Sequence, residues 1–77
     1  MMNEHSIQKN FIIYKLNEIM DDYEINLDDA IDFLMDRFLY FYMFESLTIL
    51  LEIQHEVRTL RENIVSLFFI NMYKYRL

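Results

Sequence analysis

Apolar side chains recur every three or four residues near the start of the chain, which is the spacing of one face of an α-helix. The positions that share this face are Phe11, Ile12, Leu16, Ile19, Met20 and Tyr23. Ser6 precedes them, and its hydroxyl can accept a hydrogen bond from a backbone N–H in the first turn. The pattern predicts a first helix over residues 7–23 and disorder over residues 1–5.

A turn is predicted at residues 24–26, because Asn26 tolerates left-handed backbone angles and can also cap the helix that follows. Two aspartates come next, where carboxylates interact favourably with the dipole of a helix N-terminus. We therefore expect a second helix over residues 27–44. Its second half, residues 33–44, is apolar almost all round, which indicates a helix buried on most sides or placed at an oligomer interface.

The clearest periodicity follows, where apolar residues alternate at spacings of three and four as in a coiled coil. The residues of this seam are Leu50, Ile53, Val57, Leu60, Ile64 and Leu67. We expect a third helix over residues 47–74, after a bend or short break near residues 44–47. The spacing fits the core stripe of a three-helix bundle and a contact between subunits equally well.

The composition leaves few alternatives to helix, because the 77 residues include no glycine, proline or cysteine. Hydrophobic residues make up 55% and aromatic residues 17% of the chain. A domain of this size buries only about 60% of its unfolded surface, so such a surplus of apolar residues predicts self-association. We predict a single all-α domain over residues 1–77, a helical hairpin plus a long C-terminal helix, that forms oligomers, preferably dimers, through a helical bundle.

The predicted oligomer interface combines the aromatic run with the seam, because aromatic anchors dominate the energetics of many interfaces. The residues assigned to it are Phe38, Phe41, Tyr42, Phe44, Leu50, Ile53, Val57, Leu60, Ile64, Leu67 and Phe68.

Acidic residues are concentrated in the first half of the chain. Residues 1–36 hold nine acids and two bases, net −7, whereas residues 37–77 hold four acids and five bases, net +1. An acidic block repels nucleic acid and anionic lipid and attracts cationic partners. It fits either a solvated face or a surface that docks on a basic protein partner. The acids assigned to this surface are Glu18, Asp21, Asp22, Glu24, Asp28, Asp29, Asp32 and Asp36.

No group of residues suggests catalysis or metal binding. Glu52 and His55 have the Glu-x-x-His spacing of di-iron bundles, but the heptad phase places both outside the seam. The acids of residues 22–28 lack the glycine and the bidentate glutamate of a calcium loop. Without cysteine or glycine, neither a thiol nucleophile nor a phosphate-binding loop can form. We therefore predict no enzyme activity, no cofactor and no metal, and the short basic tail at residues 73–76 is not expected to bind nucleic acid.

The codons of the abundant residues indicate an origin. Isoleucine (10), phenylalanine (7), tyrosine (6) and asparagine (6) have AT-rich codons, whereas the absent glycine and proline have GC-rich ones. We expect a phage, viral or mobile-element protein, located in the host cytoplasm, that acts as an inhibitor or modulator by binding a host or partner protein. The alternative is a structural subunit of a larger multi-chain assembly. Acids at the start of the second helix argue against a membrane-surface role, since interfacial helices favour Lys and Arg there.

Overall fold

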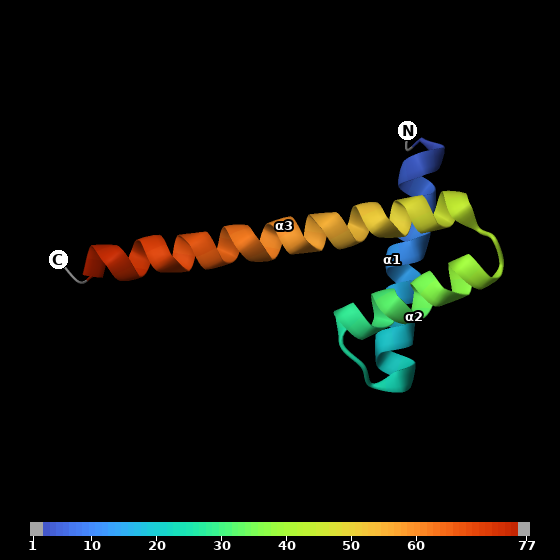
Figure 1. The fold of residues 1–77 in the computed structure, drawn as a ribbon, viewed down its shortest axis with the longest axis horizontal. Coiled ribbons are helices and arrows are strands. Elements are labelled where there is room, and N and C mark those ends of the chain that lie inside the picture. The colour runs from blue at the N-terminus through green and yellow to red at the C-terminus, as the bar shows by residue number, and fades with distance from the viewer. Residues whose placement is uncertain (1–2, 76–77) are drawn as a thin grey trace.

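The computed structural model describes residues 3–75, with side chains as far as residue 70, and within these residues the fold consists of three α-helices without strands. The helices are α1 (Glu4–Tyr23), α2 (Leu27–Tyr40) and α3 (Phe44–Tyr75), as Figure 1 shows. The predicted all-α fold class is confirmed, and the last helix, with 32 residues, is the longest.

The second half of α3 projects away from the rest of the chain (Figure 1). α1 crosses behind α2 and α3 in this view, and every pair of helices is in contact. The radius of gyration is 16.1 Å, whereas a compact domain of this length would have a value of about 11.5 Å. We refer to residues 3–57 as the head and to residues 58–75, the projecting part of α3, as the arm.

The hydrophobic core lies where the three helices cross, and each helix contributes to it. Its buried residues are Ile12, Leu16, Ile19, Ala30, Ile31, Leu34, Phe38, Ile49, Leu50 and Ile53. Two residues of the predicted α1 face, Phe11 and Tyr23, are instead 60% and 58% exposed. Because α1 crosses the other helices rather than running along them, only a narrow stripe of its surface is covered.

Asparagines cap the first two helices. The side chain of Asn26 accepts a hydrogen bond of 2.9 Å from the Asp29 N–H, which confirms its predicted role at the start of α2. α1 begins at Glu4, three residues earlier than predicted, because Asn3 rather than Ser6 is the cap, accepting from the Ser6 N–H at 2.8 Å. Residues 3–5, predicted to be disordered, thus form the cap and first turn of α1, while residues 1 and 2 lie outside the described part of the chain.

The break between α2 and α3 occupies residues 41–43, earlier than the predicted position at 44–47. The Met43 N–H donates to the Phe38 carbonyl (2.8 Å) and the Tyr42 N–H to the Leu39 carbonyl (3.2 Å). This is the Schellman pattern, whose left-handed position usually holds glycine. Here Tyr42 takes that position, with φ 57°. The sequence pattern could not locate the break because no glycine marks it.

The end of α1 is built in the same way. Glu24 adopts left-handed angles (φ 52°, ψ 45°), and the Ile25 N–H donates to the Met20 carbonyl at 3.2 Å. Both turns of the head therefore depend on a residue with a Cβ atom in a conformation that glycine adopts more readily.

Candidate interaction surfaces

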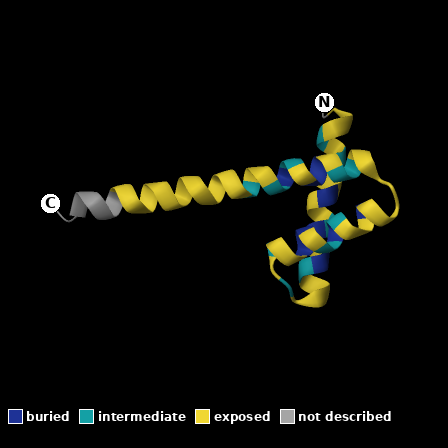
Figure 2. Cartoon of the chain, in the orientation of Figure 1, coloured by how far each residue is buried: buried dark blue, intermediate teal, exposed yellow. Residues whose placement is uncertain are grey.

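The arm is exposed along its whole described length. Every residue from 58 to 70 is solvent-exposed, as the change to yellow along α3 shows in Figure 2. Figure 2 also shows that buried positions on α3 are confined to the part that crosses α1 and lies beside α2. The arm therefore makes no core contact within its own chain.

The coiled-coil seam is divided between two environments. Leu50 and Ile53 are 0% and 5% exposed in the core, whereas Leu60 and Leu67 are 61% and 60% exposed on the arm. Val57, between them, is partly buried. Of the two interpretations that the spacing allowed, the core stripe applies to the first half of the seam. The second half has no partner within the part of the chain that the structure describes.

The predicted oligomer interface divides in the same way. Three of its residues are buried in the core of the head: Phe38, Leu50 and Ile53. Another chain therefore cannot contact them. Val57 is partly buried, and the other predicted interface residues, which are exposed, are Phe41, Tyr42, Phe44, Leu60, Ile64, Leu67 and Phe68.

The tip of the arm is apolar around its whole circumference. Six of the seven residues from 64 to 70 are apolar, with Ser66 the exception, and all are exposed. Successive residues of a helix are rotated by about 100°, so such a run covers every side of α3. Phe68 and Phe69 also contact each other edge to face, with ring centroids 6.2 Å apart. The tip therefore exposes a contiguous apolar surface to solvent.

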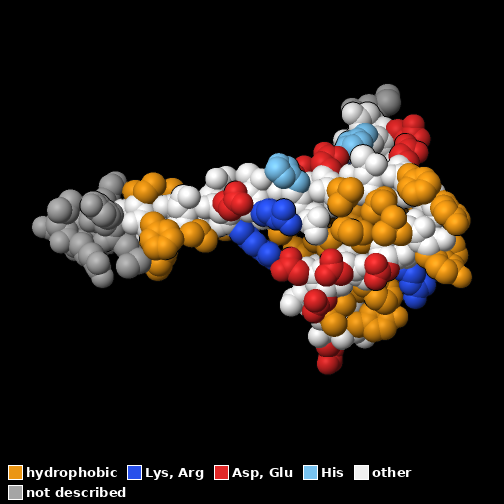
Figure 3. All heavy atoms as spheres, viewed as in Figure 1, with side chains coloured by type: hydrophobic (Ala, Val, Ile, Leu, Met, Phe, Trp, Pro, Cys, Tyr) orange, Lys and Arg blue, Asp and Glu red, His pale blue; other side chains and the backbone are white. Residues whose placement is uncertain are grey.

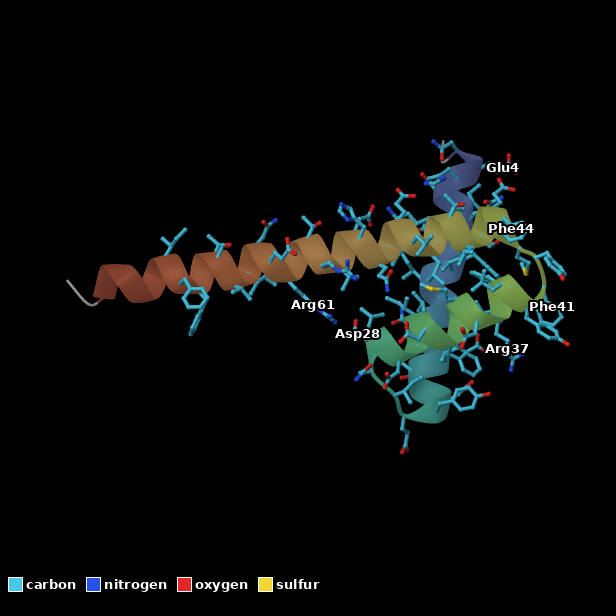
Figure 4. All side chains as sticks on the ribbon, viewed as in Figure 1. Glu4, Asp28, Arg37, Phe41, Phe44 and Arg61 are labelled. Atoms are coloured by element: carbon cyan, nitrogen blue, oxygen red, sulfur yellow. The ribbon has the colours of Figure 1, made fainter. Side chains whose placement is uncertain are left out.

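A second apolar surface, which we term the aromatic corner, comprises residues 40–44 at the junction of α2 and α3. Tyr40 and Tyr42 are 77% and 78% exposed, and they contact Phe41 and Phe44 with ring centroids 5.0 and 6.1 Å apart. Figure 4 labels Phe41 and Phe44 at the end of the head that lies farthest from the arm. The two exposed apolar surfaces therefore lie at opposite ends of the molecule.

An apolar groove lies at the base of the arm, in the angle between α1 and α3. Its volume is about 340 Å³, and its walls are formed by Ile13, Leu16, Asn17, Met20, Leu27, Ile53, Glu56, Val57 and Leu60. On α3, residues 53, 57 and 60 share one helical face with residues 64 and 67. The groove and the seam of the arm thus form one continuous apolar surface.

Ion pairs connect the base of the arm to the head. The guanidinium of Arg61 donates from Nη1 to both carboxylate oxygens of Asp28, each at 3.0 Å, and Figure 4 shows the two side chains directed toward each other. On the other side of α3, Lys9 Nζ lies 2.6 Å from Glu56 and 3.6 Å from Glu52. These contacts join α2 and α1 to α3.

The hydrogen bond that Lys9 donates to Glu56 raises the pKa of Lys9 above its ordinary value of 10.5, and the negative charges of Glu56 and Glu52 act in the same direction. A raised pKa in the folded state means that the ion pair contributes its full stabilisation below pH 10.5. The contribution is lost only as the pH rises through the pKa of the folded state.

Glu52 is engaged within the head, since its carboxylate also lies 3.0 Å from His5 Nε2. His55, three residues further on, is exposed. In the described part of the chain, no cluster of three His, Asp or Glu side chains is arranged to hold a metal ion.

All eight acids of the predicted docking surface are exposed. Glu18 lies 3.4 Å from Lys15, and Asp28 binds Arg61. Among the described residues, the other six form no ion pair: Asp21, Asp22 and Glu24 at the end of α1, and Asp29, Asp32 and Asp36 on α2. Helical spacing places the last three on the face of α2 opposite its core residues. Figure 3 shows acidic side chains gathered over α2; we call these six residues the acidic surface.

The head and the arm carry opposite net charges. Residues 1–57 hold twelve acids and three bases, a net charge of −9, whereas the arm, residues 58–75, holds one acid and three bases, a net charge of +2. Figure 3 shows Lys and Arg side chains at the base of the arm, next to the acids over α2. The net charges of residues 1–36 and 37–77 do not reveal this difference, because the boundary between head and arm falls at residue 57.

Sequence reasoning did not identify the groove or the ion pairs. Asp28 and Arg61 are 33 positions apart, and no local pattern predicts which acid and which base will meet. Ile13 and Leu27, which line the groove, belong to none of the periodic apolar patterns found in the sequence. Their role follows only from the angle at which α1 crosses α3.

Comparison of the chain with protein-family models, with curated proteins and with solved structures finds no match. Within residues 3–75, none of the helices combines the length and the hydrophobicity required to cross a lipid bilayer.

Proposed function

We propose that this protein is a protein–protein interaction module with two binding surfaces: the arm, which pairs with another helix, and the acidic surface, which binds a basic protein partner. The observation that carries this proposal is the arm, whose tip is apolar and whose described side chains, at residues 58–70, are all exposed. A helix of about 18 residues is marginally stable in water by itself, and most helical stability in proteins comes from packing of an apolar face. A partner helix would supply that packing.

The exposed area supports the same function. Seven large apolar side chains of the arm are 51–62% exposed: Leu60, Ile64, Val65, Leu67, Phe68, Phe69 and Ile70. Phe68 and Phe69 each present on the order of 100 Å², judged from the 150–250 Å² that aromatic side chains bury. The aliphatic side chains add to this area, so the arm offers a substantial part of the roughly 800 Å² that each partner contributes to a standard interface.

The acidic surface supports the second part of the proposal. Six exposed carboxylates, which form no ion pair with any side chain that the structure describes, lie on a head of net charge −9 and attract a basic protein and repel nucleic acid. Under this proposal the head covers a basic surface of a host or partner protein and thereby modulates it, as expected for an inhibitor from a virus or mobile element.

Light scattering coupled to size exclusion tests the role of the arm. The wild type is expected to associate, and the double substitution Ile64→Lys and Leu67→Lys to give a monomer with unchanged head packing, because it places two charges in the apolar seam. Glu62→Lys, on the polar side of the same helix, is the matched control and should associate normally. If the wild type and the double variant are equally monomeric and equally soluble, the arm is not an interaction surface.

Binding to an immobilised lysine-rich peptide tests the acidic surface. Charge reversal of Asp29, Asp32 and Asp36 to Lys should abolish retention, and retention of the wild type should fall as salt screens the charges. A control that reverses two exposed acids elsewhere, Glu45 and Glu62, should retain most of the binding. Equal loss in both variants would mean that the protein binds through its overall net charge rather than through the acidic surface.

A structural subunit of a larger assembly is the second candidate. The observation that favours it is the tip of the arm, which is apolar on all sides, since one partner helix covers only one side. The aromatic corner at the opposite end offers a further contact. In the scattering experiment this function predicts species that grow with protein concentration, rather than a single discrete oligomer.

A further inference from the structure

We propose that the helix that pairs with the arm belongs to a second copy of this chain, aligned antiparallel, so that the tip of each arm lies in the apolar groove at the base of the other. This inference rests on the proposed function of the arm and adds the identity and the direction of its partner. It follows from the continuity of the apolar surface, the length of the arm and the distribution of charge.

The continuity of the apolar surface along α3 defines the path of the second arm. Leu60 and the partly buried Val57, which line the groove, share one face of α3 with the exposed Ile64 and Leu67. A helix packed along that face therefore runs from the tip of the arm to the groove at the edge of the head. There it also meets the side chains of α1 that form the other wall.

The length of the arm fits the antiparallel direction. Eighteen helical residues, 58–75, extend for about 27 Å. When two such arms run in opposite directions with Leu60 opposite Ile64 of the second copy, Val57 lies opposite Leu67 of the second copy, so these layers of the pair are apolar. In this register residues 67–75 of each arm reach the head of the other.

Charge selects between the two directions. An antiparallel pair places each arm, of net charge +2, beside a head of net charge −9, and it separates the two heads by more than the screening length of about 8 Å at physiological ionic strength. A parallel pair would bring the two acidic heads together and the two basic ends together. Charge complementarity therefore favours the antiparallel pair and disfavours the parallel one.

The groove enlarges the buried surface beyond the arm itself. One face of the arm alone offers only part of the roughly 800 Å² per chain found in a standard interface. Apolar side chains of the groove, including Ile13 and Met20, add to that area in the antiparallel pair. The two contacts are equivalent by symmetry, since the tip of each copy occupies the groove of the other.

The absence of cysteine from the chain allows a direct test of direction. Two single variants, Val57→Cys and Leu67→Cys, are prepared with tags of different size, mixed, and oxidised. The antiparallel pair brings residue 57 of one copy within disulfide distance of residue 67 of the other, so the mixture should form a cross-linked heterodimer, and neither variant alone should cross-link. Glu62→Cys, on the outer side of the arm, is the control and should remain uncross-linked in any mixture.

Three outcomes overturn the inference. Cross-linking of each variant with itself shows a parallel pair, which refutes the direction but leaves the arm as a helix-pairing surface. A wild type that forms no discrete dimer and instead aggregates or binds vesicles, with relief by Ile64→Lys and Leu67→Lys, shows that another chain or lipid covers the arm. A wild type as monomeric and soluble as that double variant refutes the proposed function together with the inference.

A substitution in the groove tests the contact between tip and head. Ile13→Lys places a charge in the groove without altering the arm, and we expect it to raise the dimer dissociation constant by about tenfold or more. Tyr14→Lys, at the neighbouring exposed position outside the groove, is the matched control and should change that constant by less than about threefold. Equal dissociation constants for Ile13→Lys and the wild type would show that the tip does not occupy the groove.

Discussion

Leu50 and Leu67 have the same side chain, belong to the same helix and follow the same heptad spacing, yet their substitution by alanine should have very different effects. Leu50 is 0% exposed and Leu67 is 60% exposed. Truncation of a buried leucine removes its transfer free energy and leaves a cavity, which costs about 2–5 kcal/mol. A chain of this length has a total stability of about 4–11 kcal/mol. Leu50→Ala should therefore remove a large part of the free energy of unfolding.

Leu67→Ala should change the stability of the monomer by no more than about 0.5 kcal/mol, since it removes no intrachain contact. Urea denaturation followed by circular dichroism measures both values, at a protein concentration low enough to dissociate any oligomer. Leu50→Ala should lower the midpoint at every concentration, whereas the effect of Leu67→Ala should appear only as the concentration rises. Equal destabilisation by the two substitutions in the monomer would show that the arm folds back onto the head.

Three further predictions concern the turns and ion pairs of the head. Glu24→Gly should raise the free energy of unfolding by about 0.5–1 kcal/mol, because relief of the strain at the left-handed backbone angles exceeds the added entropy of the unfolded chain. Glu24→Ala should not stabilise the protein. Asp28→Asn should cost only about 0.2–1 kcal/mol in urea denaturation, less at high salt, because its ion pair with Arg61 is exposed. Above pH 10.5 the wild type should lose more stability than Glu56→Gln, since the substitution removes the carboxylate that does most to raise the pKa of Lys9 and leaves only that of Glu52; equal losses would contradict that assignment.

Local features of the sequence predicted where the first two helices meet, but not which helical faces would be buried. The end of α1 at Tyr23 and the start of α2 at Leu27 agree with the prediction, because apolar spacing and the Asn26 cap act within a few residues. The break after Tyr40 was misplaced, because the residue that makes it is a tyrosine in a glycine conformation. A spacing pattern records which residues share a face of a helix, but not what lies against that face.

The candidate surfaces were predictable to different degrees. The exposure of the acids follows from their charge, and all eight are indeed exposed. The division of the seam at Val57 could not be predicted, since it depends on where α1 and α2 cross α3. The charge difference between head and arm was present in the sequence, but it became visible only once the structure showed where the head ends.

The three residues between α2 and α3 also determine what the chain would become without its core. α2 ends at Tyr40 and α3 begins at Phe44. If residues 41–43 adopted helical angles, residues 27–75 would form one helix about 73 Å long. That helix would separate Phe38 from Leu50, so burial of these two side chains, rather than any breaker residue, keeps the chain bent. Substitutions that disrupt the core would therefore let residues 41–43 straighten and would also lower the free energy of unfolding. The opened chains would exchange helices between copies by domain swapping.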